Sequence, residues 1–325
     1  MNTKAIKSPR GAAAIGLRKH RKGLYTNLCR YWQLYLFLLL PILYLLVFKY
    51  TPILGLQIAF KKYSIAGGIW GSKWIGLNNF QRFFTSYQFR RVLPNTILLS
   101  FYQLLASFPL PIILALCFNA MRVKRYKKFA QTLTYIPHFI STVVLVGMLF
   151  QLFNARVGLY GTLYYWFHGV YPAKDLLASP TAFRHMYVWS GIWQNAGWGT
   201  IIYVASLTSV DVELHEAAEI DGASRFKRLI HIDFPAIVPT ISIMLILNAG
   251  NMMNIGFEKV YLMQNDLNRS ASEVISTYVY NVGLAAGGGD FSYATAIGLF
   301  NSAVNCLLIV IVNAVSKRAG ESSLW

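Results

Sequence analysis

The sequence predicts an all-α, polytopic membrane protein with six transmembrane helices. Hydrophobic residues make up 55% of the 325 residues and charged residues only 13%, and the mean hydropathy is +0.44. Soluble domains are less apolar and more charged. Six segments are each long and apolar enough to cross the roughly 30 Å of membrane hydrocarbon as a helix. They lie at residues 32–52, 94–118, 132–153, 186–208, 236–257 and 291–315.

The first segment, at residues 32–52, follows a basic tail at residues 1–31. Such a tail before an apolar run resembles a secretion signal, but no small-residue cleavage site follows it, so we expect an uncleaved anchor. Residues 53–92 then form an extracellular loop rich in aromatic residues. These aromatic residues fit either an interfacial belt or a surface for a partner protein or for sugar rings.

The other five segments form a core at residues 93–315, followed by a short tail at residues 316–325. The segment at 186–208 is the most polar of the six. Because polar side chains in a span usually face protein or water, we expect that helix inside the bundle.

The distribution of Lys and Arg predicts the topology. With six spans both termini share one side of the membrane, and 18 of the 30 Lys and Arg residues lie on that side. Cytoplasmic loops are enriched in these residues. We therefore expect cytoplasmic N- and C-termini, with the loops at 53–92, 154–184 and 259–290 outside.

Composition and motif content also exclude several functions. The net charge is +18, but nucleic-acid binding requires a basic face on a soluble fold, so we expect no nucleic-acid partner. The basic tail is instead suited to contact membrane lipid. The three cysteines lack CxxC spacing and His138 has no second ligand at metal spacing, so no metal site is expected. No GxxxxGK[ST] motif is present, so this chain is expected to bind no ATP of its own.

A patterned polar segment at residues 211–235 separates the fourth and fifth predicted helices. Its acidic residues favour the start of a short helix, Gly222 permits a tight bend, and its alanines leave room for another backbone. We expect two short helices joined by a bend at the membrane surface, although an ordinary interfacial hairpin fits the spacing equally well. The acidic and small residues are Glu213, Glu216, Glu219, Asp221, Ala217, Ala218 and Ala223.

The same segment resembles the cytoplasmic signature of the membrane subunits of ATP-binding-cassette (ABC) importers. That signature reads E-A-A, three residues, G, nine residues and then I-x-L-P. Phe234 stands in the Leu position, and the other signature residues are Glu216, Ala217, Ala218, Gly222, Ile232 and Pro235. Nearly the whole chain resembles polysaccharide-type permeases (the LplB type) of the maltose-permease-like group. Matching stretches include Tyr135–Ser141, Gly256–Val260 and Ser323–Trp325.

This resemblance implies the MetI-like fold of type I ABC importers and a non-catalytic permease in the cytoplasmic membrane of a bacterium. The signature, with Asp221 and Ala223, would enter a cleft of a cytoplasmic ABC ATPase dimer, which binds the ATP and Mg. The resemblance also implies a second homologous permease subunit, an extracellular solute-binding lipoprotein and an oligosaccharide or polysaccharide fragment as substrate.

Two sets of polar residues are candidates for the solute pathway. One set falls within an arc of about 120° on a helix with 100° per residue, and the other clusters on the fourth predicted helix. Amides and aromatic rings suit a sugar, but interhelical hydrogen bonds explain these residues equally well. The first set is Asn248, Asn251, Asn254 and Glu258, and the second is Gln194, Asn195 and Trp198.

Two other function classes are weaker alternatives. A secondary carrier predicts inverted repeats, and no convincing repeat relates the two halves. A membrane-embedded enzyme for glycans or lipids needs clustered acids or histidines, and the five acidic residues expected outside are scattered.

The excess of positive charge on the outer loops is compatible with a uronic-acid-containing substrate.

Overall fold

The computed structural model describes residues 30–285 and 289–318, which form two units, up to Gln57 and from Ile58 onward. The predicted basic tail lies outside the described residues except for Arg30 and Tyr31, and so does the end of the C-terminal tail.

The first unit is helical. It contains α2 (Trp32–Leu45), the π-helical turn η1 (Leu46–Tyr50) and the start of the 3-10 helix η2 (Thr51–Phe60). These elements follow one another as a helix of 29 residues. None of the residues of α2 is buried, and the helix is apolar on all sides, as expected for a surface that faces lipid. The predicted first span is therefore helical and continues to Phe60.

The predicted extracellular loop is ordered where it belongs to the second unit. A two-stranded antiparallel ribbon pairs β1 (Lys61–Lys62) with β2 (Lys73–Trp74). Between and after the strands lie α3 (Gly68–Gly71) and α4 (Asn78–Thr85). The buried Asn79 of α4 donates from Nδ2 to the carbonyl of Ala59 near the end of η2 at 2.8 Å and to the carbonyl of Lys61 in β1 at 3.4 Å, which ties α4 to the start of the ribbon.

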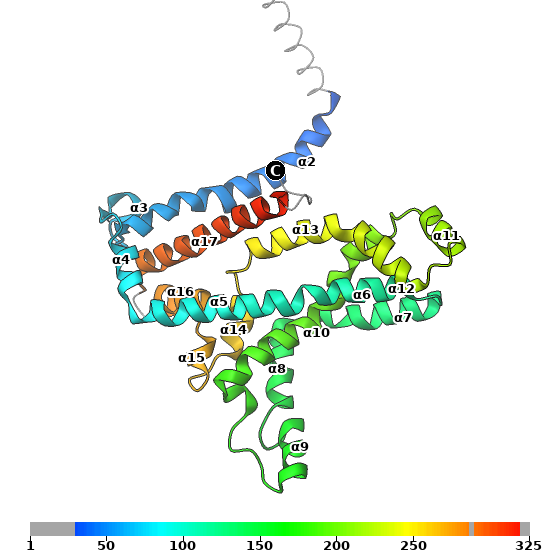
Figure 1. Cartoon of the computed structure of the whole chain (residues 1–325). Coiled ribbons are helices and arrows are strands. Elements are labelled where there is room, and N and C mark those ends of the chain that lie inside the picture. The colour runs from blue at the N-terminus through cyan, green and yellow to red at the C-terminus, as the bar shows by residue number, and fades with distance from the viewer. Residues whose placement is uncertain (1–29, 286–288, 319–325) are drawn as a thin grey trace, which may run out of the picture. The chain divides into compact units, whose positions relative to one another are not determined.

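The second predicted span is α5 (Tyr87–Ser107) and α6 (Pro109–Ala120), a nearly continuous pair that crosses the middle of Figure 1. The Ser86 hydroxyl caps α5 by accepting from the amide of Phe89.

The third predicted span, 132–153, is not one straight helix. Instead α7 (Lys124–Tyr135) and η3 (Ile136–Phe139) meet α8 (Thr142–Leu152) at an angle of 96°. Pro137 and Ser141 explain the bend. Pro137 lacks a backbone N–H, and the Ser141 hydroxyl caps the new helix by accepting from Val144.

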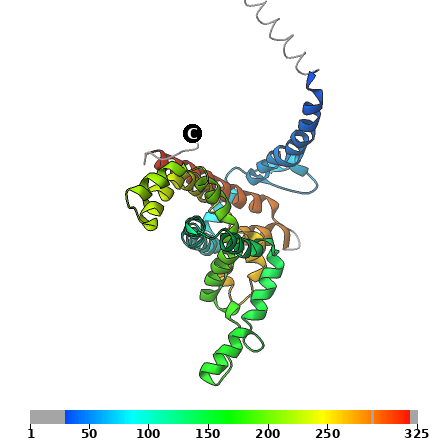
Figure 2. The same cartoon turned by 90° about the vertical axis from the view of Figure 1, so that its right-hand side faces the viewer.

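The short helix α9 (Leu159–His168) and the turn η4 (Leu176–Ala178) lead into α10 (Pro180–Leu207). This 28-residue helix is the centre of the second unit and packs against α5, α6 and α13 (Figures 1 and 2). One apolar cluster joins it to α5, α8 and α14, and a second joins Tyr203 and Leu207 to α6 and to Ile237 of α13.

The patterned segment forms α11 (Val212–Ile220) and α12 (Arg225–Arg228). From α12 the chain continues through the π-helical turn η5 (Leu229–Asp233) into α13 (Phe234–Gly250). The fifth predicted span, 236–257, therefore ends early, at Gly250.

Five further elements complete the described chain. They are α14 (Phe257–Met263), α15 (Arg269–Ser272), α16 (Ile275–Tyr280), η6 (Asn281–Ala285) and α17 (Phe291–Arg318). The last of these contains the sixth predicted span, and its apolar face packs on α4 and α16.

Six spans are not confirmed. Within the described ranges, four helices are long and apolar enough to cross a membrane, or five if the bent pair counts as one span. The fourth predicted span, α10, is long enough but too polar to belong to that set. The four helices are Trp32–Phe60, Tyr87–Ala120, Arg225–Gly250 and Phe291–Arg318.

Candidate functional site

The hairpin of α11 and α12 has the predicted two-helix shape with a tight bend. The Asp211 side chain caps α11 by accepting from the amide of Glu213 at 3.0 Å. At the other end Gly222 takes φ +74°, in the left-handed region that glycine adopts without strain. The amide of Ala223 then bonds the carbonyl of Ala218 at 2.9 Å, which closes the end of α11.

Arg228 holds the two arms of the hairpin together. Its guanidinium donates to the carboxylate of Glu219 at 2.7 Å and to the carbonyl of His215 at 3.3 Å. The Arg228 side chain is only 16% exposed, whereas that of Glu219 is 69% exposed. The arginine therefore serves as an internal brace of the hairpin.

Most of the signature residues face solvent. Glu216, Ala217, Asp221, Gly222 and Pro235 are exposed, and α11 buries none of its residues. Apolar side chains around them, such as Ile220 and Phe226, are 88% and 70% exposed. A groove of about 330 Å³ runs along the hairpin. Its lining includes Ala218, Ala223, Lys227, His231 and Ile232.

One buried carboxylate connects the hairpin to the membrane helices. Asp233 is 5% exposed. Its Oδ1 accepts from Nδ2 of Asn119, at the end of α6, and lies 3.1 Å from Nε2 of His215, on α11. Asp233 occupies the variable position of the I-x-L-P part of the signature, so the sequence did not single it out as a functional residue. The one sequence feature that pointed to it is that it is an acidic residue between two apolar residues, Ile232 and Phe234.

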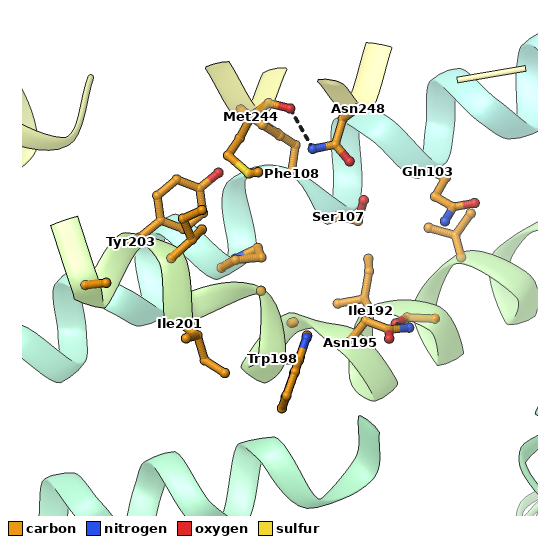
Figure 3. Close-up of a pocket in the computed structure, with 17 residues that line it drawn as sticks. Gln103, Ser107, Phe108, Ile192, Asn195, Trp198, Ile201, Tyr203, Met244 and Asn248 are labelled. Atoms are coloured by element: carbon orange, nitrogen blue, oxygen red, sulfur yellow. Dashed lines mark hydrogen bonds between the residues drawn. The ribbon is translucent and has the colours of Figure 1, made fainter. Parts of the chain in front are cut away.

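A cavity of about 700 Å³ lies among α5, α6, α10 and α13 (Figure 3). Three of the predicted pathway residues line it: Asn195, Trp198 and Asn248. Figure 3 shows that Asn195 and Trp198 come from α10, whereas Asn248 approaches from the opposite side, where its Nδ2 donates to the carbonyl of Met244 at 2.7 Å. Gln103 and Ser107 of α5 add polar groups that the sequence did not single out.

Beside this cavity, the bend between η3 and α8 carries an aromatic cluster. The His138 imidazole lies parallel to the Trp198 indole, with ring centroids 4.5 Å apart, and its Nδ1 is 2.9 Å from Oδ1 of Asn195. Phe139 packs its ring edge-on against the same indole. His138 is thus a hydrogen-bonded partner of two predicted pathway residues, which sequence reasoning did not anticipate. Among the described residues no cluster of His, Cys, Asp or Glu could hold a metal ion.

The other predicted pathway residues do not line the cavity. Gln194 is buried and donates from Nε2 to the carbonyl of Ile140 at 2.7 Å. Asn251 donates to the carbonyl of Leu247, Asn254 accepts from two asparagines of α17, and Glu258 is exposed on α14.

The predicted polar stripe along one helix does not form, because the helix ends at Gly250. A Cβ at this position would overlap Ile309 of α17, so the glycine permits close packing of the two helices. Just beyond it, Oδ1 of Asn305 accepts from the amide of Met253 at 3.0 Å. The Asn305 side chain accepts from the Met253 amide in place of the backbone carbonyl that would do so in a continued helix. The helix therefore does not continue, and the four polar residues of the predicted stripe lie on different elements.

A buried cation lies behind the wall of the cavity. Lys259 of α14, outside the membrane-spanning helices, donates from Nζ to the carbonyl of Tyr187 at 2.9 Å and lies over the ring of Tyr187. No described carboxylate forms an ion pair with it. Burial lowers the pKa of Lys259 to about 8.

Comparison with known proteins decides the family. Residues 107–321 match the family model described as "Binding-protein-dependent transport system inner membrane component". The chain belongs to this family. It is accordingly a membrane-embedded permease subunit of an ABC importer, a component without catalytic activity of its own.

Two relatives and one solved structure show the likeness over most of the chain. The permease is 42% identical to the polygalacturonan/rhamnogalacturonan transport system permease protein YteP of Bacillus subtilis, over 100% of both chains. It is 44% identical to the protein LplB of the same organism, over 90% of this chain and 91% of that one. A permease chain in a crystal structure of a bacterial ABC transporter that imports the acidic polysaccharide alginate superimposes with a TM-score of 0.81. That pair is 37% identical and covers 91% of this chain and 98% of the other.

Proposed function

We propose that this permease carries an acidic oligosaccharide into the cell, and that the hairpin of α11 and α12 couples its movement to a separate ATPase dimer. The observation that carries the coupling role is the exposed signature on a braced hairpin. Glu216, Gly222 and Pro235 face outward while Arg228 fixes the two helices to each other. Such a rigid, partly apolar surface fits a protein cleft better than it fits solvent.

The partners follow from the same proposal. The ATPase supplies the ATP and Mg sites, an extracellular solute-binding lipoprotein delivers the sugar, and a second homologous permease completes the pathway. A related alginate importer has been solved with a periplasmic protein that holds an alginate pentasaccharide. The lining of Asn195, Trp198 and Asn248 supports a sugar route, because amides bond hydroxyls and an indole packs on the apolar face of a sugar ring.

The substrate class rests on the relatives. Pectic polymers and alginate, named for two of them, share uronic-acid units. With the predicted orientation, both termini lie in the cytoplasm of a bacterium and the hairpin faces the ATPase. Labelling of single cysteines at Ser209 and at Ser179 with an impermeant reagent tests this orientation, since only the second should react from outside.

Uptake into proteoliposomes tests the function. The permease, its partner permease, the ATPase and the binding protein are reconstituted together and given a labelled galacturonic-acid oligosaccharide. We expect uptake that requires ATP and the binding protein. Uptake driven by a proton or sodium gradient without ATP would establish the secondary-carrier alternative instead.

A further inference from the structure

We propose that Asp233 is the positioning residue that transmits movement of the coupling hairpin to α6, and through α6 to the wall of the cavity. This inference rests on the proposed coupling function, which it extends by naming the contact through which the movement passes. Three observations support it: where Asp233 lies, which elements it joins, and how α6 reaches the cavity.

First, Asp233 lies at the junction of the hairpin and the membrane helices. It is the last residue of the π-helical turn η5, directly before α13. Its carboxylate is buried, and a buried charge is stable only where hydrogen bonds or an opposite charge compensate it. The polar groups that face it are the His215 imidazole and the Asn119 amide.

Second, these two partners lie on two different helices, and among the described residues η5 makes no other side-chain hydrogen bond to either helix. His215 belongs to α11, the helix that carries the signature, and its Nε2 lies 3.1 Å from Oδ1 of Asp233. Asn119 is close to the C-terminal end of α6 and donates to that same oxygen at 3.1 Å. A shift of α11 therefore displaces an oxygen that is also bonded to α6.

Third, α6 extends from this junction to the cavity. Its first turn supplies Pro111 to the cavity lining, and Phe108 lines the cavity just before α6 begins. In addition, α6 packs along α10, which carries Asn195 and Trp198. Because closely packed helices move as rigid bodies, an axial or tilting movement at Asn119 reaches the cavity wall.

Energetic coupling between Asn119 and Asp233 can be measured directly. Asn119→Asp places two carboxylates in contact and should remove most of the stimulation of ATP hydrolysis by the loaded binding protein, at least fivefold. Asp233→Asn keeps an oxygen that can accept from the Asn119 amide, so stimulation should fall about twofold or less. The exchanged pair, Asn119→Asp with Asp233→Asn, restores one amide and one carboxylate and should recover at least half of the wild-type stimulation.

The measurement uses the whole reconstituted complex, with a galacturonic-acid oligosaccharide as the probe. Basal hydrolysis without the binding protein, and co-purification of the ATPase, are recorded for each variant. A purely structural role of the contact predicts that assembly and basal hydrolysis fall together with stimulation. The proposed role predicts that the Asn119→Asp complex assembles and hydrolyses ATP at the basal rate but no longer responds to the loaded binding protein. Gln131→Glu, which adds a carboxylate to the next helix, α7, is the matched control and should respond like wild type.

Besides the joint loss of assembly and basal hydrolysis that a purely structural role predicts, two results would overturn the inference. One is full stimulation in the Asn119→Asp complex. The other is an exchanged pair that assembles but is no better coupled than Asn119→Asp alone. If the wild-type complex itself shows no stimulation, the proposed coupling function fails, whatever the variants do.

Discussion

The imidazole of His138 and the indole of Trp198 lie face to face, 4.5 Å between centroids and 6° from parallel. The two residues come from distant parts of the sequence, η3 after α7 and the middle of α10, with α8 and α9 between them. Their contact, with the hydrogen bond from His138 to Asn195, fixes the orientation of the indole beside the cavity.

Trp198→Ala should weaken the interaction of the permease with the sugar during transport. An aromatic packing partner contributes about 1 kcal/mol beyond simple burial, so the apparent KM for uptake of a galacturonic-acid oligosaccharide should rise about fivefold. The matched control is Trp193→Ala on the same helix. Trp193 is similarly exposed but lines a separate apolar groove with Leu145 and Met148. Equal effects of the two substitutions would contradict a role for Trp198 in the sugar route.

Gly222 should tolerate asparagine better than alanine, and alanine better than valine. Its φ of +74° disfavours side chains by about 1 to 2 kcal/mol, least for asparagine. A Cβ there would meet no atom within 4 Å, so only the backbone conformation is penalised. Stimulated ATP hydrolysis in the reconstituted complex should fall in that order. Gly147→Ala, at a helical glycine that is equally uncrowded, should leave the rate unchanged.

Breaking the ion pair of Arg91 and Glu273 should destabilise the part of the permease where α5 meets the segment between α15 and α16. Glu273 is 4% exposed, and Arg91→Met leaves its carboxylate buried without its arginine, which costs about 3 to 5 kcal/mol. Thermal unfolding in detergent should detect this loss, and Arg91→Met with Glu273→Leu should recover much of it. The pair of Arg82 and Asp290 is exposed, so Arg82→Met should cost about 1 kcal/mol or less.

Lys259 should make stability depend on alkaline pH. Because burial lowers its pKa from 10.5 to about 8, the unfolded chain binds more protons at this site than the folded chain does between these two values. This group therefore adds stability as the pH rises from about 8 to 10.5 and contributes no slope below 8, with a total of up to about 3 kcal/mol. Thermal unfolding should show wild type gaining stability relative to Lys259→Met across this window. A constant difference from pH 7 to 10 would exclude the shifted pKa.

The sequence predicted the hairpin of α11 and α12 closely, because local chemistry determines its shape. Asp211 supplies a cap, the alanines between it and Gly222 favour a helix, and Gly222 takes the left-handed backbone of the bend without strain. No distant contact is needed for these features. The signature from which the family was predicted lies within this locally determined segment, and the match to the family model confirms that family.

The third and fifth spans show where such reasoning fails. Hydropathy counts apolar residues and cannot detect that the Ser141 hydroxyl starts a new helix, or that Asn305 captures the amide of Met253. Both breaks depend on particular hydrogen bonds, and the second comes from a residue far along the chain. The polar stripe failed for the same reason. Asn195, Trp198 and Asn248 meet at one cavity, whereas Gln194 on the same helix faces the backbone of Ile140.

The polarity of α10 has a consequence for biogenesis. Gln194 depends on the Ile140 carbonyl at the end of η3, so one of the polar groups of the helix is satisfied only after its neighbours are in place. A segment of this kind gains little by leaving the translocon alone, since polar side chains raise its insertion free energy. We expect α10 to remain beside the translocon until the preceding helices have gathered. Replacing Gln194 with leucine should therefore speed its release into lipid while leaving the bend at Ile140 without its side-chain donor.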